Sequence, residues 1–272
     1  MKRKWIVMFF AVLFLAAVAF LLDKDNSGTA NTNGYKVPPT VFVHGYKGTY
    51  NSFGNMLDRF ENNYRWGDKM LVYYITPNGR LEVDHMGYAE EQPSFVQIVL
   101  DNNRASFKNS AYWVSLALHH MKTHYQIDQV YMVGHSMGGI VSLKYIEDYR
   151  NPKNFPMVKK FIAIGSPFDG IYDKRYFEFH QDAATKDLKP SSKALTDLRK
   201  HKNTVPKDLE ALSIASTGDH VARVNSVKSL GEIIPASNLE QKVITDENLG
   251  HSMLHEDKRV DFFVHDFLYG EN

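Results

Sequence analysis

The stretch Gly134-His135-Ser136-Met137-Gly138-Gly139 decides the fold that we predict for this chain. An apolar run at 129–133 precedes it, and apolar residues at helical spacing follow it from 140 to 149. A strand, a Gly-x-Ser-x-Gly turn and a helix in this order are typical of a nucleophile elbow. Glycine at 134 and 138 avoids side-chain clashes in so sharp a turn, so we expect Ser136 to project from a sheet edge as a nucleophile.

The rest of the chain alternates between strand-like and helix-like segments. Helical spacing is clear at 107–125 and in the closing segment 260–267, and Ser52 is expected to cap a helix that buries Phe53, Met56, Leu57 and Phe60. Asn78-Gly79 predicts a hairpin into 80–83. This alternation favours an α/β fold, a mostly parallel central sheet with helices on both faces. The predicted strands besides 129–133 are 40–43, 70–76, 95–100, 158–164, 209–216 and 241–245.

A second glycine turn follows the first predicted strand. His44-Gly45-Tyr46 comes directly after the apolar run 40–43. Enzymes with a nucleophile elbow place an oxyanion donor in this position, so we expect the backbone N–H groups of Tyr46 and Met137 to form an oxyanion hole. We interpret His44 as a residue that holds this loop, because a strand end followed by glycine offers it a packing role.

A serine nucleophile needs a base, and the base needs a carboxylate. The expected chain order is Ser, then Asp or Glu, then His. Asp219 follows the predicted strand 209–216, with Asp169 and Asp246 as alternatives, and His251 lies in a loop after the last strand. We therefore predict Ser136, Asp219 and His251 as the catalytic residues. The other downstream histidines are His220, His255 and His265.

Residues 171–207 interrupt the alternation and suggest a cap or lid over the site. Its first part is aromatic, and its second part, 186–207, is rich in lysine and carries a short predicted helix at 194–198. We predict that Phe168, Tyr172 and Tyr176 contact the substrate, although such residues also serve to pack a cap onto a sheet. The basic residues favour a solvated face over an anion site.

Residues 1–22 predict a membrane helix. Lys2-Arg3-Lys4 is followed by eighteen apolar residues, long enough at about 27 Å to cross a bilayer. The basic start predicts that the following chain is extracytoplasmic. A single-pass signal anchor is favoured over a cleaved signal peptide, which would leave a secreted protein. We interpret residues 23–35 as a flexible tether and residues 36–272 as the catalytic α/β domain.

Composition narrows the possible functions. The net charge of +1 gives no support for nucleic-acid binding, and the absence of cysteine excludes disulfides and thiol catalysis. His251, His255 and Glu256 do not match the His-Glu-x-x-His spacing of a zinc site, so we expect neither metal nor cofactor. Nothing in the sequence indicates an oligomeric state.

Taken together, His44-Gly45, the elbow, Ser166-Pro167-Phe168-Asp169-Gly170, Gly218-Asp219 and the segment 251–255 resemble the α/β-hydrolases. Within them the chain is similar to the exported cell-surface hydrolases of Gram-positive bacteria. The resemblance covers roughly residues 36–270. It implies lipase- or esterase-like cleavage of small-molecule or lipid esters by Ser136, Asp219 and His251. An acyltransferase, a peptidase with the same residues, or a non-catalytic surface binding protein are the alternatives.

Overall fold

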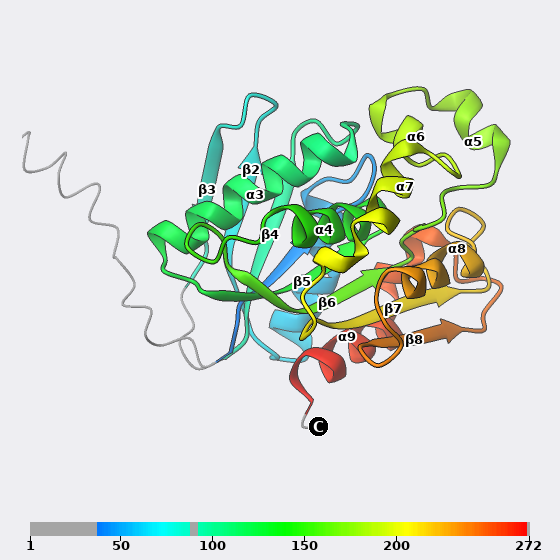
Figure 1. The fold of residues 1–272 in the computed structure, drawn as a ribbon. Helices are drawn as coiled ribbons and strands as arrows, with labels where there is room; N and C mark the ends of the chain where they lie inside the picture. Colours follow the sequence, from blue (N-terminus) through cyan, green and yellow to red (C-terminus); the bar gives the residue numbers. More distant parts are fainter. Residues whose placement is uncertain (1–36, 88–91, 271–272) are drawn as a thin grey trace, which may run out of the picture. The chain divides into compact units, whose positions relative to one another are not determined.

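An eight-stranded sheet forms the centre of the computed structural model, which describes residues 37–87 and 92–270 (Figure 1). The predicted anchor 1–22 and the tether 23–35 lie outside the described residues. Within the described ranges, no helix combines the length and the apolarity that crossing a bilayer requires. The strands are β1 (Thr40–Val43), β2 (Asp68–Ile75), β3 (Leu81–His85), β4 (Ser94–Leu100), β5 (Gln129–His135), β6 (Met157–Ile164), β7 (Glu210–Ser216) and β8 (Leu239–Ile244).

The strand order places the chemistry-bearing loops on one edge. It runs β3-β2-β4-β1-β5-β6-β7-β8, and every neighbouring pair is parallel except the hairpin of β2 and β3. β1 lies between β4 and β5, with Thr40 opposite both Phe95 and Tyr131. Because parallel strands all end at the same side, the loops after β1, β5, β7 and β8 open on one rim. The predicted mostly parallel α/β fold is confirmed.

Helices cover both faces of the sheet (Figure 1). Successive side chains of a strand point to opposite faces, so the apolar residues of β1 need a core on each side. Val41 and Val43 of β1 pack into a core with the long helices α3 and α4, whereas Phe42 between them points into the opposite core with α2 and α9. The helices are α2 (Gly54–Asp58), α3 (Phe107–His124), α4 (Met137–Asp148), α5 (Lys174–Phe179), α6 (Ala183–Asp187), α7 (Lys193–Lys200), α8 (Val224–Lys228) and α9 (Lys258–Tyr269), with the short helical turns η1 (Tyr50–Ser52), η2 (Arg59–Asn63), η3 (Lys202–Thr204), η4 (Ser229–Glu232) and η5 (His251–Glu256).

Two features near the ends of elements differ from the sequence prediction. Ser52 does not cap a helix. Thr49 is the cap of η1, and Ser52 completes a capping box by accepting the N–H of Thr49 at 2.9 Å. The predicted burial of the apolar face that follows is confirmed.

The 171–207 insertion, between β6 and β7, holds α5 and α6 in addition to the predicted helix near 194–198, which is α7.

Candidate active site

Ser136 lies in the turn between β5 and α4 with φ 55° and ψ −127°, a backbone conformation that residues other than glycine rarely adopt. The turn is held by a hydrogen bond from Ser136 N–H to the carbonyl oxygen of Ile164, 2.8 Å. A Cβ atom on Gly134 would lie 2.4 Å from the backbone nitrogen of Gly139, and one on Gly138 would lie 2.1 Å from the oxygen of Val43. The two glycines of the motif are therefore steric requirements of the turn.

Three side chains that are far apart in sequence meet at this turn. His251 Nε2 lies 2.8 Å from Ser136 Oγ, and His251 Nδ1 lies 2.7 Å from Asp219 Oδ2. Asp219 is buried, and its other oxygen accepts N–H groups of Val221 and Ala222 at 2.9 and 2.8 Å. A carboxylate facing Nδ1 favours the tautomer with the proton there, which leaves Nε2 free to accept the serine proton.

The alternative carboxylates make other contacts. Asp169 pairs with Arg199 at 2.6 Å, and Asp246 pairs with Arg259 at 2.7 Å. Asp219 is therefore the aspartate that the structure joins to His251.

The alternative histidines also lie elsewhere. His220 is exposed beside Asp219, and His265 stacks on the ring of Trp66 with centroids 4.0 Å apart. His255 follows His251 by one turn and packs edge-on against His135 at 4.7 Å. The structure brings Ser136 together with His251 and with none of these three.

A buried serine that the sequence analysis did not single out ties the two loops together. Ser216, the last residue of β7, donates its hydroxyl to the carbonyl oxygen of Leu249 at 2.8 Å and accepts the N–H of Gly218 at 3.2 Å. One side chain thus fixes the loop that carries Asp219 against the loop that carries His251. In the sequence, the only indication of this role is that Ser216 ends an apolar predicted strand.

His135, inside the Gly-x-Ser-x-Gly motif, was also missed. Its Nε2 lies 3.1 Å from the carbonyl oxygen of His251, to which it donates. Burial, reinforced by the nearby rings of His251 and His255, holds the pKa of His135 well below its usual range. Burial likewise lowers the pKa of His255. Both rings are therefore neutral at pH 7, and His135 orients the backbone of His251 without adding a charge beside it.

The predicted oxyanion donors lie on either side of Ser136. Met137 is the first residue of α4, a position whose N–H has no acceptor within the helix. Gly45 packs directly against Ser136, since a Cβ on Gly45 would lie 2.8 Å from the serine Cβ. That contact brings Tyr46, the next residue, to the same turn.

His44 holds the loop that carries Tyr46. Its Nε2 accepts the N–H of Leu100 at 2.9 Å, and its Nδ1 lies 2.9 Å from the oxygen of Gly45. Burial lowers the pKa of His44, so the ring stays neutral and bridges the ends of β1 and β4.

A groove of about 550 Å³ opens beside Ser136 and His251. Tyr176 of α5 lines it, as predicted for a substrate contact, together with His180 at the end of that helix. Tyr46 faces both of them, with ring centroids 6.2 Å from Tyr176 and 5.5 Å from His180, and donates its hydroxyl to Asp182 at 2.5 Å. The 171–207 insertion therefore forms one wall of the groove.

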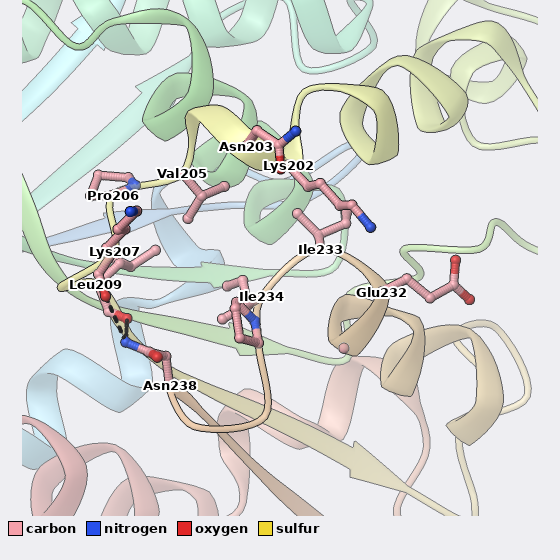
Figure 2. A pocket seen from close by; sticks show the side chains of 12 residues that line it. Lys202, Asn203, Val205, Pro206, Lys207, Leu209, Glu232, Ile233, Ile234 and Asn238 are labelled. Carbon is pink, nitrogen blue, oxygen red and sulfur yellow. Dashed lines mark hydrogen bonds between the residues drawn. The ribbon is translucent and has the colours of Figure 1, made fainter.

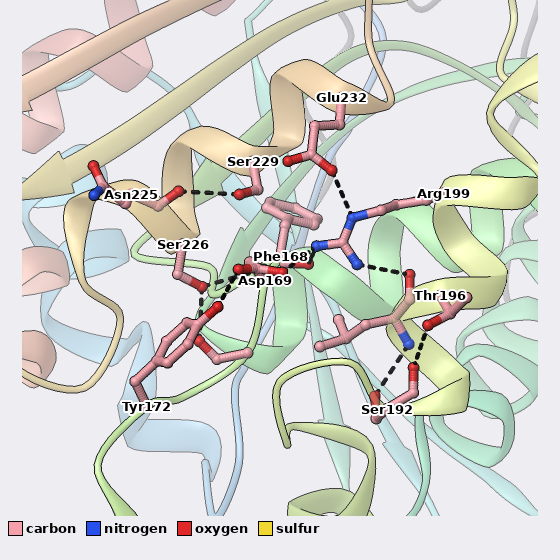
Figure 3. A network of polar contacts seen from close by, with 12 residues as sticks. Phe168, Asp169, Tyr172, Ser192, Thr196, Arg199, Asn225, Ser226, Ser229 and Glu232 are labelled. Carbon is pink, nitrogen blue, oxygen red and sulfur yellow. Dashed lines mark hydrogen bonds and ion pairs between the residues drawn. The ribbon is translucent and has the colours of Figure 1, made fainter.

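Phe168 and Tyr172 are not among the residues that line this groove. They lie in a network of polar contacts with Asp169 and Arg199 (Figure 3). Phe168 is buried in the core, and its carbonyl oxygen accepts from Arg199 at 3.1 Å. Tyr172 is half exposed and donates its hydroxyl to Asp169. Arg199 also pairs with Glu232 and Asp169, at 2.8 and 2.6 Å. Phe168 thus has a packing role, the alternative considered for it, whereas Tyr172 is half exposed and hydrogen-bonded to Asp169.

A larger hollow of about 740 Å³ lies away from Ser136, between the η3–β7 segment and the η4–β8 loop (Figure 2). Val205, Ile233 and Ile234 line it, and Asn238 spans it at one end by donating to the backbone oxygens of Lys207 and Leu209. It shares no lining residue with the groove at Ser136. Within the described ranges, no group of three or more His, Asp or Glu side chains is placed to hold a metal ion.

Comparison with solved structures shows the same fold in proteins of low sequence identity. The gene lin2722 product of Listeria innocua is 23% identical, with a TM-score of 0.74 over 87% of this chain and 96% of that one. A Lactobacillus plantarum WCFS1 protein, provisionally assigned as a cell surface hydrolase, is 20% identical, with a TM-score of 0.70 over 87% and 93%. An esterase from Exiguobacterium antarcticum is 16% identical, with a TM-score of 0.50 over 86% and 92%.

No curated protein gives a significant match to the sequence. A family model does, and it spans residues 27–271, nearly the whole chain. Its description is alpha/beta hydrolase of unknown function (DUF915). The match agrees with the parallel sheet, the turn at Ser136 and the resemblance noted in the sequence. The chain belongs to this family of α/β-hydrolases.

Proposed function

We propose that this protein is a serine hydrolase that cleaves carboxylic esters. His251 accepts the proton of Ser136 through Nε2 as the serine oxygen attacks the ester carbonyl carbon. The N–H groups of Met137 and Tyr46 stabilise the resulting oxyanion. The imidazolium then protonates the departing alkoxide, which leaves an acyl-enzyme. Water, deprotonated by His251, attacks the acyl carbon, and the acid departs as Ser136 regains its proton.

The observation that carries this proposal is the pair of hydrogen bonds that joins Ser136 to His251 and His251 to Asp219, at 2.8 and 2.7 Å. A serine hydroxyl needs such a base, and the base needs a partner for its developing charge. The esterase among the similar structures supports the reaction class at the level of fold.

The test is the turnover of p-nitrophenyl acetate by three forms of the full chain. Ser136→Ala should lower kcat at least about 10³-fold, because the attacking oxygen is gone. Asp219→Asn should lower kcat about 10³–10⁴-fold, because the amide favours the wrong histidine tautomer. A fluorophosphonate probe should label the unmodified chain and not Ser136→Ala.

Asp169→Asn is the matched control, since Asp169 lies outside the groove and pairs with Arg199. It should keep turnover within about threefold of the unmodified chain. Turnover that survives loss of the Ser136 hydroxyl would refute the mechanism.

We further propose that the hydrolase domain acts outside the cytoplasmic membrane, tethered through residues 1–22. The basic residues before the apolar run support this orientation. The likeness to a protein provisionally assigned as a cell surface hydrolase agrees with it. Protease added to intact spheroplasts should digest the domain, and its protection until lysis would contradict the proposed location.

A further inference from the structure

The groove beside Ser136 is lined by hydroxyl, amide, ammonium and imidazole groups together with the rings of Tyr46 and Tyr176. Thr49, Asn51 and Ser52 line it on one side, and Ser252 lines it on the side of His251. Val221 is the only purely aliphatic side chain among the described residues that form it. A long acyl chain gains binding energy only where it meets apolar surface. Beyond the rings of Tyr46 and Tyr176, such a chain would displace water from hydroxyl and amide groups without replacing their hydrogen bonds, which is unfavourable.

The groove also holds an exposed lysine. Lys47 follows the proposed oxyanion donor Tyr46 directly, and its side chain is exposed along the groove. Its Nζ lies 3.1 Å from Nδ1 of His180 and 5.3 Å from the centroid of the Tyr46 ring. Nδ1 of His180 accepts one ammonium hydrogen in this contact, and two donors of Lys47 remain available.

No negative charge in the groove balances this ammonium group. The described residues that line the groove include neither aspartate nor glutamate, and no carboxylate in the described ranges lies within ion-pair distance of Lys47. Two carboxylates contact lining residues of the groove, Tyr46 and His255, without lining it themselves. Asp182 accepts the hydroxyl of Tyr46, and Glu256 accepts from Arg59 at 3.3 Å. The ammonium group of Lys47 is therefore open to a charged partner from the substrate.

From these observations we infer that the groove selects short, polar esters that carry a negatively charged group, with Lys47, steadied by His180, as the specificity-determining residue. The inference rests on the proposed ester hydrolysis and names its substrate class. Lys47 would form a charge-assisted hydrogen bond to a carboxylate or phosphate while the scissile carbonyl lies at Ser136. Long-chain neutral lipid esters are poor substrates in this view.

The test compares matched esters that differ in charge and little in shape, using the full chain purified in detergent. Monomethyl glutarate against its methyl glutaramate analogue places the charge on the acyl side. Acetoxyacetate against acetoxyacetamide places it on the alcohol side. We expect at least about tenfold higher kcat/KM for the charged member in one of the two arms, and p-nitrophenyl palmitate to be cleaved more slowly than the acetate.

Variants of Lys47 assign the preference to this side chain. Lys47→Met should reduce the charged-to-neutral ratio to about twofold or less, whereas Lys47→Arg, which keeps the charge, should retain most of it. Lys186→Met is the matched control, because Lys186 is an exposed lysine of α6 that does not line the groove, and it should leave the ratio unchanged. Circular dichroism of each variant shows that it is folded.

The outcomes separate this inference from the proposed function. Fluorophosphonate labelling of Ser136 with equal rates for charged and neutral esters in both arms would overturn the substrate class and leave the hydrolase proposal standing. A charge preference that survives in Lys47→Met would overturn the role of Lys47. Absence of both labelling and turnover would overturn the hydrolase proposal itself.

Discussion

At the scale of single residues, Ser136 is held in a conformation that its neighbours enforce. A positive φ at a residue other than glycine costs on the order of 1–3 kcal/mol, and it persists only where the surroundings determine it. The hydrogen bond to Ile164 and the close approach of Gly138 to the end of β1 provide that determination. The serine hydroxyl is thereby presented to His251 before any substrate arrives.

Gly138→Ala should destabilise the protein by about 1–3 kcal/mol or more, because the new methyl group would lie 2.1 Å from the backbone oxygen of Val43. Gly54→Ala is the control. Its nearest neighbour would be 4.0 Å away, and in α2 it should stabilise by about 0.5–1 kcal/mol. Urea denaturation measures both, and equal stabilities of the two variants would contradict this account of the elbow.

At the scale of elements, the 171–207 insertion is connected to the loop that carries the proposed oxyanion donor. Asp182 caps α6 by accepting the N–H of Thr185 at 3.1 Å, and its other oxygen accepts the hydroxyl of Tyr46 at 2.5 Å. Burial, aided by Asp182, raises the pKa of Tyr46, so its hydroxyl remains a donor. One carboxylate therefore joins the start of a helix to the proposed oxyanion donor, which follows the glycine that packs on Ser136.

Asp182→Ala should lower kcat for p-nitrophenyl acetate about 3–10-fold with little change in KM, because Tyr46 loses its anchor. Asp182→Asn keeps an acceptor oxygen and should restore most of the rate. Asp173→Ala is the control, since Asp173 caps α5 by accepting from Arg175 at 3.0 Å without touching Tyr46. A comparable loss of kcat in that control would indicate a general weakening of the insertion instead.

At the scale of the whole molecule, a buried carboxyl group on α4 opposes stability at neutral pH. Glu147 is 2% exposed, and neither of its oxygens has a hydrogen-bond partner among the described residues. Burial raises its pKa from 4.5 to about 8. The folded state holds this proton more tightly than the unfolded state does. The free energy of unfolding therefore contains the full stabilisation from protonated Glu147 below pH 4.5, and this stabilisation is lost as the pH rises from 4.5 toward 8.

Glu147→Leu should therefore raise the free energy of unfolding, by about 1–3 kcal/mol at pH 8 and by much less at pH 5. Asp148→Asn provides the control, because Asp148 lies beside it on the surface in an ion pair with Lys144 and should change stability by less than about 0.5 kcal/mol. Denaturant titrations at both pH values measure the difference. A gain that is independent of pH would exclude the proposed titration of Glu147.

Much of the fold and the site was predictable because it depends on local patterns. The glycines at 134 and 138 are required by a turn that involves only a few consecutive residues. The apolar runs at 40–43 and 129–133 predicted the bounds of β1 and β5 closely. Asp219 and His251 were identifiable because each follows a predicted strand in a parallel sheet. By contrast, α5 and α6 have only six and five residues, too few for helical spacing to show.

The sequence by itself determined the elbow and the alternation of strands and helices, since these depend on backbone sterics and periodicity, and it named the candidates for the proposed ester cleavage. Only the tertiary structure decided which of them meet. The register of the sheet brings His251 to Ser136, and the contacts of Phe168 and Tyr172 lie outside the groove. It also placed Lys47 on that groove with no carboxylate beside it. Such distances follow from packing between segments remote in sequence, which no local pattern encodes.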